Sequence, residues 1–137
     1  MKSTEPLPLP LRWMGSLSLG LLLVAGCGGS SEFKALQAKA KKGDAQAQLD
    51  LAQMHLYGKG AKQDHAVAIK WCEQAAAKGL PAAQRVYGVM LRDGYGVDRN
   101  IAKGREWLVK AADQGDAEAK LELAATPVLS PASAPKR

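Results

Sequence analysis

The sequence is poor in the residues that build β-sheets. Its 137 residues include one Phe, three Tyr and three Trp, and β-branched side chains are few, whereas Ala and Leu are abundant. β-Branched and aromatic side chains favour strands, while Ala and Leu favour helices. A chain of this length holds one domain at most. We therefore expect a single all-α domain.

Ligands for metals and cofactors are also scarce. Cys27 and Cys72 lie far apart, without the spacing of a metal site or a disulfide framework. His55 and His65 have no carboxylate or cysteine at ligand spacing, so structural or surface roles are favoured over metal binding. The sequence contains no Gly-rich phosphate loop and no run of interleaved basic and aromatic residues. We expect no cofactor, no metal and no nucleic-acid partner.

No apolar run is long enough to cross a bilayer, which needs about 20 residues. The run from Leu17 to Ala25 is shorter and follows Lys2 and Arg12, as in an export signal. It ends in Val24-Ala25-Gly26-Cys27, which resembles the lipobox of bacterial lipoproteins. The resemblance implies cleavage before Cys27 and lipidation of its sulfur. An ordinary secretory signal with a chance cysteine is the alternative.

The lipobox resemblance also implies a location. Acyl chains on Cys27 would hold the protein on a membrane. The next residue is Gly28 rather than aspartate, which in that family favours the periplasmic face of the outer membrane. We expect four segments, which are a signal peptide (1–26), a flexible tether (27–31), a helical array (32–125) and a disordered, proline-containing tail (126–137).

A repeat of 36 residues organises the array. The stretch from Asp44 to Gly79 aligns with that from Leu80 to Gly115, and ten positions are identical, among them Trp71/Trp107. A further step brings residues 116–124 onto 44–52. This period accommodates two helices and two turns, which is typical of an α-solenoid.

Glycine and capping residues recur at the expected helix ends. They predict helices near residues 33–42, 45–57, 65–78, 81–92, 101–114 and 117–125. The first of these corresponds to the second helix of a repeat and would cap the stack. We expect an α/α solenoid of antiparallel helix pairs, with two full repeats and a half repeat at each end.

The large residues inside the repeats indicate a core. Trp71 and Trp107 occupy matched positions beside small alanines, so each is expected to anchor one layer of the core. Cys72 matches Leu108, so that position is expected to be apolar and its thiol to be buried and inert.

The pattern A-x-A…G-x-G…A…W…A-A-x-x-G resembles the Sel-one-like repeats, which are related to tetratricopeptide repeats. The resemblance covers about residues 32–125 and implies a right-handed superhelix that binds protein partners without catalysis. Two departures stand out, since Gly104 replaces a helical alanine and Arg85 occupies a position that is Leu in the flanking repeats. They predict a less stable second repeat, or an Arg85 side chain that extends to solvent.

The candidate binding surface lies on the first helix of each repeat. Helical spacing places one set of side chains on a common face, and Val86 and Val89 would be its apolar centre. Burial of these valines by helix crossing is the open alternative. The expected partner-binding residues are Gln46, Asp50, Gln53, Tyr57, Val86, Val89, Glu118 and Glu122.

Two functions from different classes remain open. The first is a lipid-anchored periplasmic adaptor for a protein partner, with no enzyme activity and with weak self-association possible through its open ends. The second is a cell-wall or polysaccharide-associated protein whose Trp71, Trp107 and Tyr95 contact sugar. The net charge of +6 argues only weakly for anionic partners. Lys39, Lys41 and Lys42 either touch anionic headgroups near the anchor or form a solvated helix face.

Overall fold

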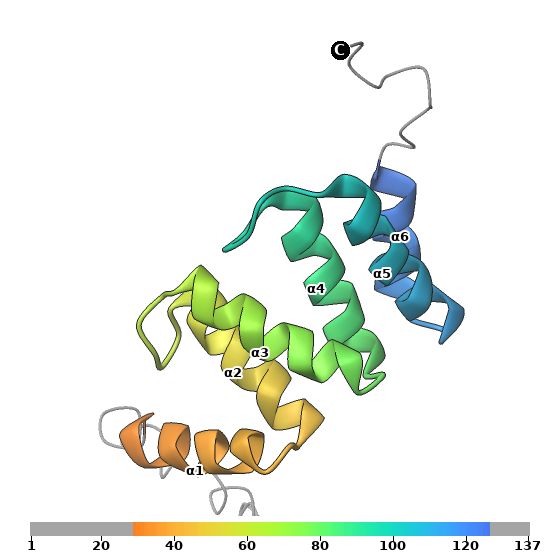
Figure 1. Cartoon of the computed structure of the whole chain (residues 1–137). Coiled ribbons are helices and arrows are strands. Elements are labelled where there is room, and N and C mark those ends of the chain that lie inside the picture. Colours follow the sequence, from red (N-terminus) through yellow and green to blue (C-terminus); the bar gives the residue numbers. More distant parts are fainter. Residues whose placement is uncertain (1–28, 127–137) are drawn as a thin grey trace, which may run out of the picture.

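The computed structural model describes residues 29–126, which form six α-helices and contain no strand (Figure 1). This confirms the all-α solenoid that the repeat predicts. The expected signal peptide, Cys27 and residues 127–137 lie outside the described residues. The helices are α1 (Gly29–Lys41), α2 (Ala45–Tyr57), α3 (His65–Ala77), α4 (Pro81–Asp93), α5 (Ile101–Asp113) and α6 (Ala117–Ala125).

Two of the expected segment boundaries are wrong. The helix α1 begins at Gly29, so residues 29–31 are helical rather than a flexible tether. Gly and Ser resemble a linker in composition, but they are tolerated in a first helical turn, where Glu32 also suits the helix dipole. Thr126, placed in the tail by its sequence, is only 3% exposed and donates its hydroxyl to the carbonyl of Glu122 at 2.6 Å. Thr126 therefore belongs to the fold.

The helix ends follow the capping residues closely. Asp44, Asp64, Asn100 and Asp116 each accept a hydrogen bond from the backbone N–H three residues further on, at 2.9–3.0 Å. Among α2 to α6 the exception is α4, which has no side-chain cap and begins instead with Pro81. Such caps satisfy backbone donors that the helix leaves unpaired. Local sequence thus fixes where most helices start.

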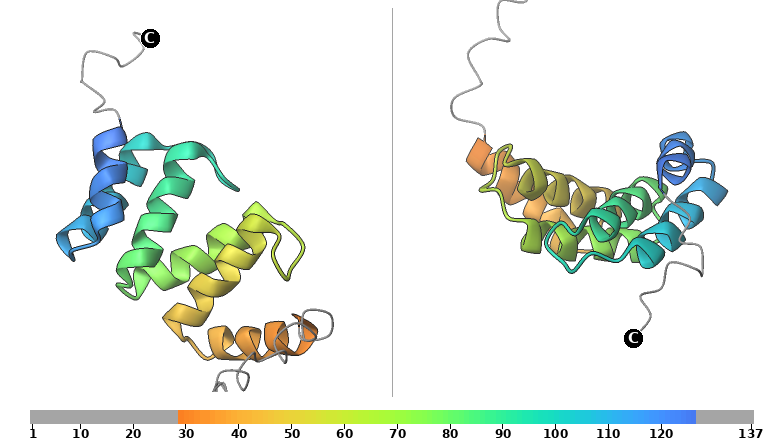
Figure 2. Two further views of the ribbon diagram at one scale, coloured as in Figure 1. Left: turned by 180° about the vertical axis from the view of Figure 1, so that it is seen from behind. Right: turned by 90° about the horizontal axis from the view of Figure 1, so that it is seen from above.

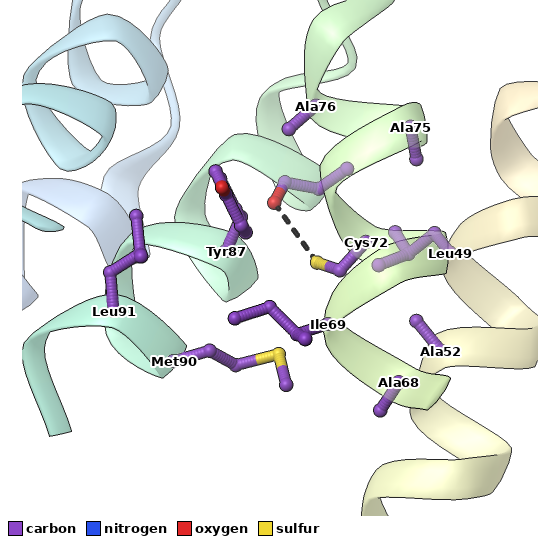
Figure 3. Packing of buried hydrophobic residues seen from close by; sticks show 11 residues of the cluster. Leu49, Ala52, Ala68, Ile69, Cys72, Ala75, Ala76, Tyr87, Met90 and Leu91 are labelled. Carbon is purple, nitrogen blue, oxygen red and sulfur yellow. Dashed lines mark hydrogen bonds between the residues drawn. The ribbon is translucent and has the colours of Figure 1, made fainter. Parts of the chain in front are cut away.

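The helices stack in chain order along a curved row from α1 at one end to α6 at the other (Figure 2). The core is therefore spread along the stack in three clusters. The largest joins α2, α3 and α4 (Figure 3), and smaller ones join α1 to α2 and α5 to α6. The main cluster consists of Leu49, Ala52, Ala68, Ile69, Cys72, Ala75, Ala76, Ala83, Tyr87, Met90 and Leu91.

Two buried glutamines connect successive repeats. Gln48 donates its side-chain amide to the carbonyl of Ala40 at 3.0 Å, and the matched Gln84 donates to the carbonyl of Ala76 at 3.3 Å. Each bond satisfies a carbonyl in the last turn of the preceding helix. The identity of the two positions in the repeat therefore has a structural cause that the sequence alone does not reveal.

The closest helix crossing is that of α4 and α5. A Cβ atom added to Gly104 would lie 2.5 Å from the carbonyl oxygen of Gly88, and one added to Gly88 would lie 2.8 Å from the carbonyl oxygen of Gly104. The first repeat has Ala52 and Ala68 at the matched positions. Gly104 therefore has a packing role, because only a residue without a Cβ atom fits this contact.

Both tryptophans of the array pack against core clusters, although each is only partly buried. Trp71 contacts the main cluster and the cluster between α1 and α2. Trp107 lies edge-on to Tyr87, with ring centroids 5.3 Å apart, and Lys110 Nζ lies 4.0 Å from its ring centroid. The rings thus contribute to the core from its edge.

Candidate functional site

A groove of about 440 Å³ lies where the two full repeats meet, and we call it the central groove. Its walls come from α2, α4 and the turns that follow them, with one residue from the start of α3 and one from α6. Leu56, Val86, Val89 and Met90 are its apolar residues, and tyrosines and charged groups complete the lining. The full set is Leu56, Tyr57, Gln63, His65, Arg85, Val86, Val89, Met90, Asp93, Tyr95 and Glu122.

The sequence leaves open whether Val86 and Val89 of α4 are exposed on a binding face or buried in the core. In the structure each is partly both. Each is half-buried. Val86 packs against the main core cluster, and Val89 packs against the cluster between α5 and α6. Both also line the central groove. They form its apolar part while remaining attached to the core, which holds the groove in a fixed shape.

Aromatic side chains lie at the edge of the groove. Tyr57 is 61% exposed and Tyr95 is 43% exposed, which is unusual for large rings in a small domain. Tyr95 lies edge-on to His65 at 5.5 Å between ring centroids. A Cβ atom on Gly96 would collide with the carbonyl of His65. The turn after α4 is therefore seated on the start of α3, and this contact positions Tyr95.

Ion pairs connect α4 to α6 at the other side of the groove. Arg85 contacts Asp116 at 3.3 Å and Glu118 at 2.7 Å. Its side chain is 24% exposed. The sequence-based expectation that Arg85 extends to solvent is thus wrong, because carboxylates of α6 and its N-cap are close enough to neutralise it. Leu would have no such partners here.

Arg92 makes a second link between these helices. It contacts Asp93 at 2.7 Å and Glu122 at 2.6 Å, and it donates to the hydroxyl of Thr126 at 3.2 Å. The hydrogen bond from Arg92 lowers the pKa of the Asp93 carboxyl. Glu118 and Glu122, expected to meet a partner, are therefore engaged within the molecule.

A second hollow of about 560 Å³, the N-terminal groove, lies between α1 and α2. It contains three of the expected binding residues, Asp50, Gln53 and Tyr57. Tyr57 also lines the central groove, so the two hollows share a wall. The N-terminal groove is lined by Glu32, Leu36, Asp50, Gln53, Met54, Tyr57 and Lys59.

The eight expected binding residues do not form one continuous patch. Four line the central groove, namely Tyr57, Val86, Val89 and Glu122. Gln46 lines neither groove and donates to Asp50 at 2.8 Å. The expected helix face does not include Leu56, His65 or Met90, which lie on other faces or ends of their helices, and the sequence indicates Tyr95 only as a sugar contact. The repeated Met54/Met90 pair was the signal that could have found one of them.

Reactive side chains are held in structural roles. Cys72 is fully buried, as its match with Leu108 predicts, and its Sγ donates to the carbonyl oxygen of Ala83 at 3.4 Å (Figure 3). Burial raises the pKa of the Cys72 thiol to about 12. The ring of His55 lies 3.0 Å from the carbonyl oxygen of Lys62 and edge-on to Phe33. Within residues 29–126, no three potential metal ligands cluster and no helix could cross a membrane.

Comparisons with known proteins identify the repeat. The sequence profile of the Sel1 repeat matches residues 45–80 and 81–116. The chain is similar in structure to a Sel1 repeat protein from Oxalobacter formigenes, with a TM-score of 0.65 and 35% identity over 67% of this chain and 69% of that chain. It is also similar to c5321, a protective antigen of uropathogenic Escherichia coli with an SLR fold, with a TM-score of 0.65 and 36% identity over 66% of this chain and 20% of that chain.

Curated relatives are much longer proteins. The chain is 38% identical over 82 residues to the chitin synthase regulator SKT5 of Saccharomyces cerevisiae, covering 58% of this chain and 12% of that protein. It is 34% identical over 87 residues to HRD3B of Arabidopsis thaliana, a component of an ERAD-associated E3 ubiquitin-protein ligase, covering 62% and 13%. The chain thus spans about an eighth of the length of these two relatives.

Proposed function

Because the chain belongs to the Sel1 repeat family, we propose that it is a lipid-anchored periplasmic adaptor that holds a protein partner in its central groove. Sel1 repeat proteins generally mediate protein–protein interaction, and their fold is not typically that of an enzyme. The finer parts of the proposal are the anchor, the compartment and the binding surface, and each rests on particular residues.

The observation that carries the binding surface is the composition of the central groove. Its apolar part, which includes Val86 and Val89, is bordered by the exposed rings of Tyr57 and Tyr95 and by charged groups. Binding energy tends to concentrate where apolar and aromatic groups are desolvated inside a polar rim. Since both valines are also attached to the core, the groove is preformed, and a partner would not have to order it.

The anchor rests on the lipobox-like sequence Val24-Ala25-Gly26-Cys27. The Gly28 that follows supports the outer membrane rather than the inner one. Only one residue, Gly28, separates Cys27 from the start of α1. An acylated Cys27 would therefore hold the whole array close to the lipid surface and restrict the partner to that surface.

Partner binding in the central groove is tested by substituting one exposed and one half-buried residue of its lining. We expect Tyr57→Ala and Val86→Glu each to weaken partner capture at least about tenfold, as loss of a central contact does. Leu121→Glu is the matched control, because Leu121 is a 71% exposed apolar residue that lines neither groove. Circular dichroism separates loss of binding from unfolding, and Tyr57→Ala keeps the test informative if Val86→Glu unfolds. Full binding by folded Tyr57→Ala and Val86→Glu would refute the central groove.

The anchor is tested by Cys27→Ser in cells fed a labelled fatty acid. We expect this variant to remain an unprocessed precursor without label, because the thioether forms on the cysteine sulfur. Cys72→Ser is the control and should be labelled as the native chain is. Labelling of the Cys27→Ser chain, or its maturation to native size, would refute the lipoprotein assignment.

Polysaccharide binding is the second candidate. The exposed rings of Tyr57 and Tyr95 support it, but Trp71 and Trp107 pack against the core and offer only part of their rings. Stacking on sugars would make tryptophan fluorescence sensitive to cell-wall fragments. We expect those fragments to leave the fluorescence unchanged, and a saturable change would favour the second candidate instead.

A further inference from the structure

The excess positive charge of the described residues lies entirely at the N-terminal end of the array. Residues 29–42 contain four lysines and one glutamate, a net charge of +3. Residues 43–126 contain eleven basic and eleven acidic side chains, so their net charge is zero. The array is thus a neutral body with one cationic helix at its end.

The lysines of this segment lie on the outer side of α1. Phe33, Leu36 and Ala40 pack toward α2 in one core cluster. Helical geometry places the lysines away from that stripe. All of them are exposed, as are the two small residues between them. We call this surface the lysine face, and it consists of Lys34, Ala35, Ala38, Lys39, Lys41 and Lys42.

The lysine face departs from the repeat in a specific way. Lys39 occupies the position of Ala75 and Ala111, both fully buried, and Ala35 occupies that of Trp71. These changes suit an outer surface at the start of the described array, where α1 is the first helix. They leave a face of small side chains and charged ends, which can approach a flat surface closely. Within residues 29–126, no lysine of this face forms an ion pair.

We propose that the lysine face of α1 lies on an anionic lipid surface and orients the array on the membrane. The proposal rests partly on the proposed anchor, because Cys27 precedes α1 by only two positions. Lysines near an anionic leaflet each strengthen membrane association several-fold within a Debye length. One lipid-linked residue together with a basic patch also holds a protein more durably than a single acyl chain does.

This orientation leaves the binding surface free. None of the residues that line the central groove belongs to α1. At the other end of the stack, α6 is the helix farthest along the row from the lysine face (Figure 2). The bilayer would therefore cover one end of the solenoid only, and a partner could enter the groove from the aqueous side.

The contact is tested by lysine footprinting of the full chain on vesicles. The chain is bound to phosphatidylcholine vesicles with or without 30% phosphatidylglycerol (about one lipid in three), and a water-soluble reagent acetylates accessible lysines. We expect acetylation of Lys34 and Lys41 to be about fivefold slower on the anionic vesicles, and the difference to disappear at high salt. Lys70 and Lys103, exposed on α3 and α5, are controls in the same molecule and should react equally on both vesicles.

Charge reversal provides an independent variant. We expect Lys34→Glu with Lys41→Glu to reduce the preference for anionic over neutral vesicles about thirtyfold, as loss of two surface-bound lysines predicts. Lys70→Glu with Lys103→Glu is the matched control and should retain the preference. Equal acetylation of the lysine face on both vesicles, uniform protection of all lysines, or equal effects of the two double variants would overturn the proposal. Specific binding of an acidic protein or nucleic acid to the lysine face, without the vesicle preference, would do so too.

The test of the lysine face can be separated from the test of the lipid anchor at Cys27. The same measurements on the full chain with Cys27→Ser report on α1 whether or not the cysteine is acylated. A retained preference for anionic vesicles in that variant supports the lysine face even if fatty-acid labelling fails. Loss of the preference only upon charge reversal assigns it to the lysines rather than to the apolar segment before Cys27.

Discussion

Single residues in this protein follow the repeat where packing is internal and depart from it at the ends. Cys72 matches Leu108, and both are fully buried. Leu121 matches Leu49, yet it is 71% exposed whereas Leu49 is buried, because within residues 29–126 no further helix packs over α6. Sequence periodicity thus predicts the type of side chain at a position, but the neighbours available along the stack decide its burial.

The buried Cys72 and Tyr87 predict a loss of stability at alkaline pH. Burial raises the pKa of Cys72 from 9.0 to about 12, and burial with the adjacent Glu73 raises that of Tyr87 from 10.0 to about 12. The unfolded chain therefore releases these protons at lower pH than the folded chain does. Both contributions are complete below about pH 9 and are lost as the pH rises toward 12.

Thermal unfolding between pH 8 and 11 checks this prediction. We expect the melting temperature of the native chain to fall above pH 9, and that of Cys72→Ala to fall less steeply from a lower starting value. The lower start reflects lost packing, so the slope is the informative quantity. Parallel curves for the two proteins would contradict the assignment to Cys72.

Helix positions were predicted well because the signals are local. Side-chain caps such as Asp64 and Asn100, and the glycines of positive φ that follow α2 and α4, act within a few residues. The contacts between helices were not predicted. The Gly88–Gly104 crossing and the Arg85 ion pairs join residues 16 to 33 positions apart, and the sequence alone does not specify which surfaces meet.

The close crossing of α4 and α5 predicts that a glycine-to-alanine substitution destabilises the fold, which is the opposite of its usual effect in a helix. Replacing a helical glycine with alanine normally stabilises a helix by about 1 kcal/mol. We expect Gly104→Ala instead to destabilise the fold by about 1–3 kcal/mol, because its Cβ would collide with the backbone of α4. Urea unfolding measures the change. Lys103→Ala, at the exposed neighbouring position, should change stability by less than about 0.5 kcal/mol, and stabilisation by Gly104→Ala would contradict the packing role.

The last helix is held differently from the others. α6 is a first helix without its second helix, and α4 contacts it through Arg85 and Arg92. These partly exposed pairs are worth little individually, but they connect two first helices across the central groove. Arg85, which stands where the flanking repeats have Leu, thus supplies contacts to α6. The second helix that would pair with α6 is lacking from the described array.

At the scale of the whole molecule, the two proposed contact surfaces lie in different parts of the array. The cationic α1 forms one end of the row (Figure 1). The central groove lies where the two full repeats meet. The sequence predicts the repeat architecture and four of the eleven residues that line the groove. It does not predict that His65 and Tyr95 meet at the groove, because the start of α3 and the turn after α4 are joined there by a contact between repeats, which has no periodic signature.

The central claim is that the protein holds its partner in the central groove. Site-specific photo-crosslinking in the native cell envelope tests this most directly. A photoreactive residue at Tyr57 or Tyr95, both exposed on the groove, is compared with one at the exposed Lys70 or Lys103 on the second helices. We predict one discrete protein adduct from the groove positions, absent from the other two and lost when Val86→Glu is added. An adduct from Lys70 or Lys103 with none from the tyrosines would contradict the claim.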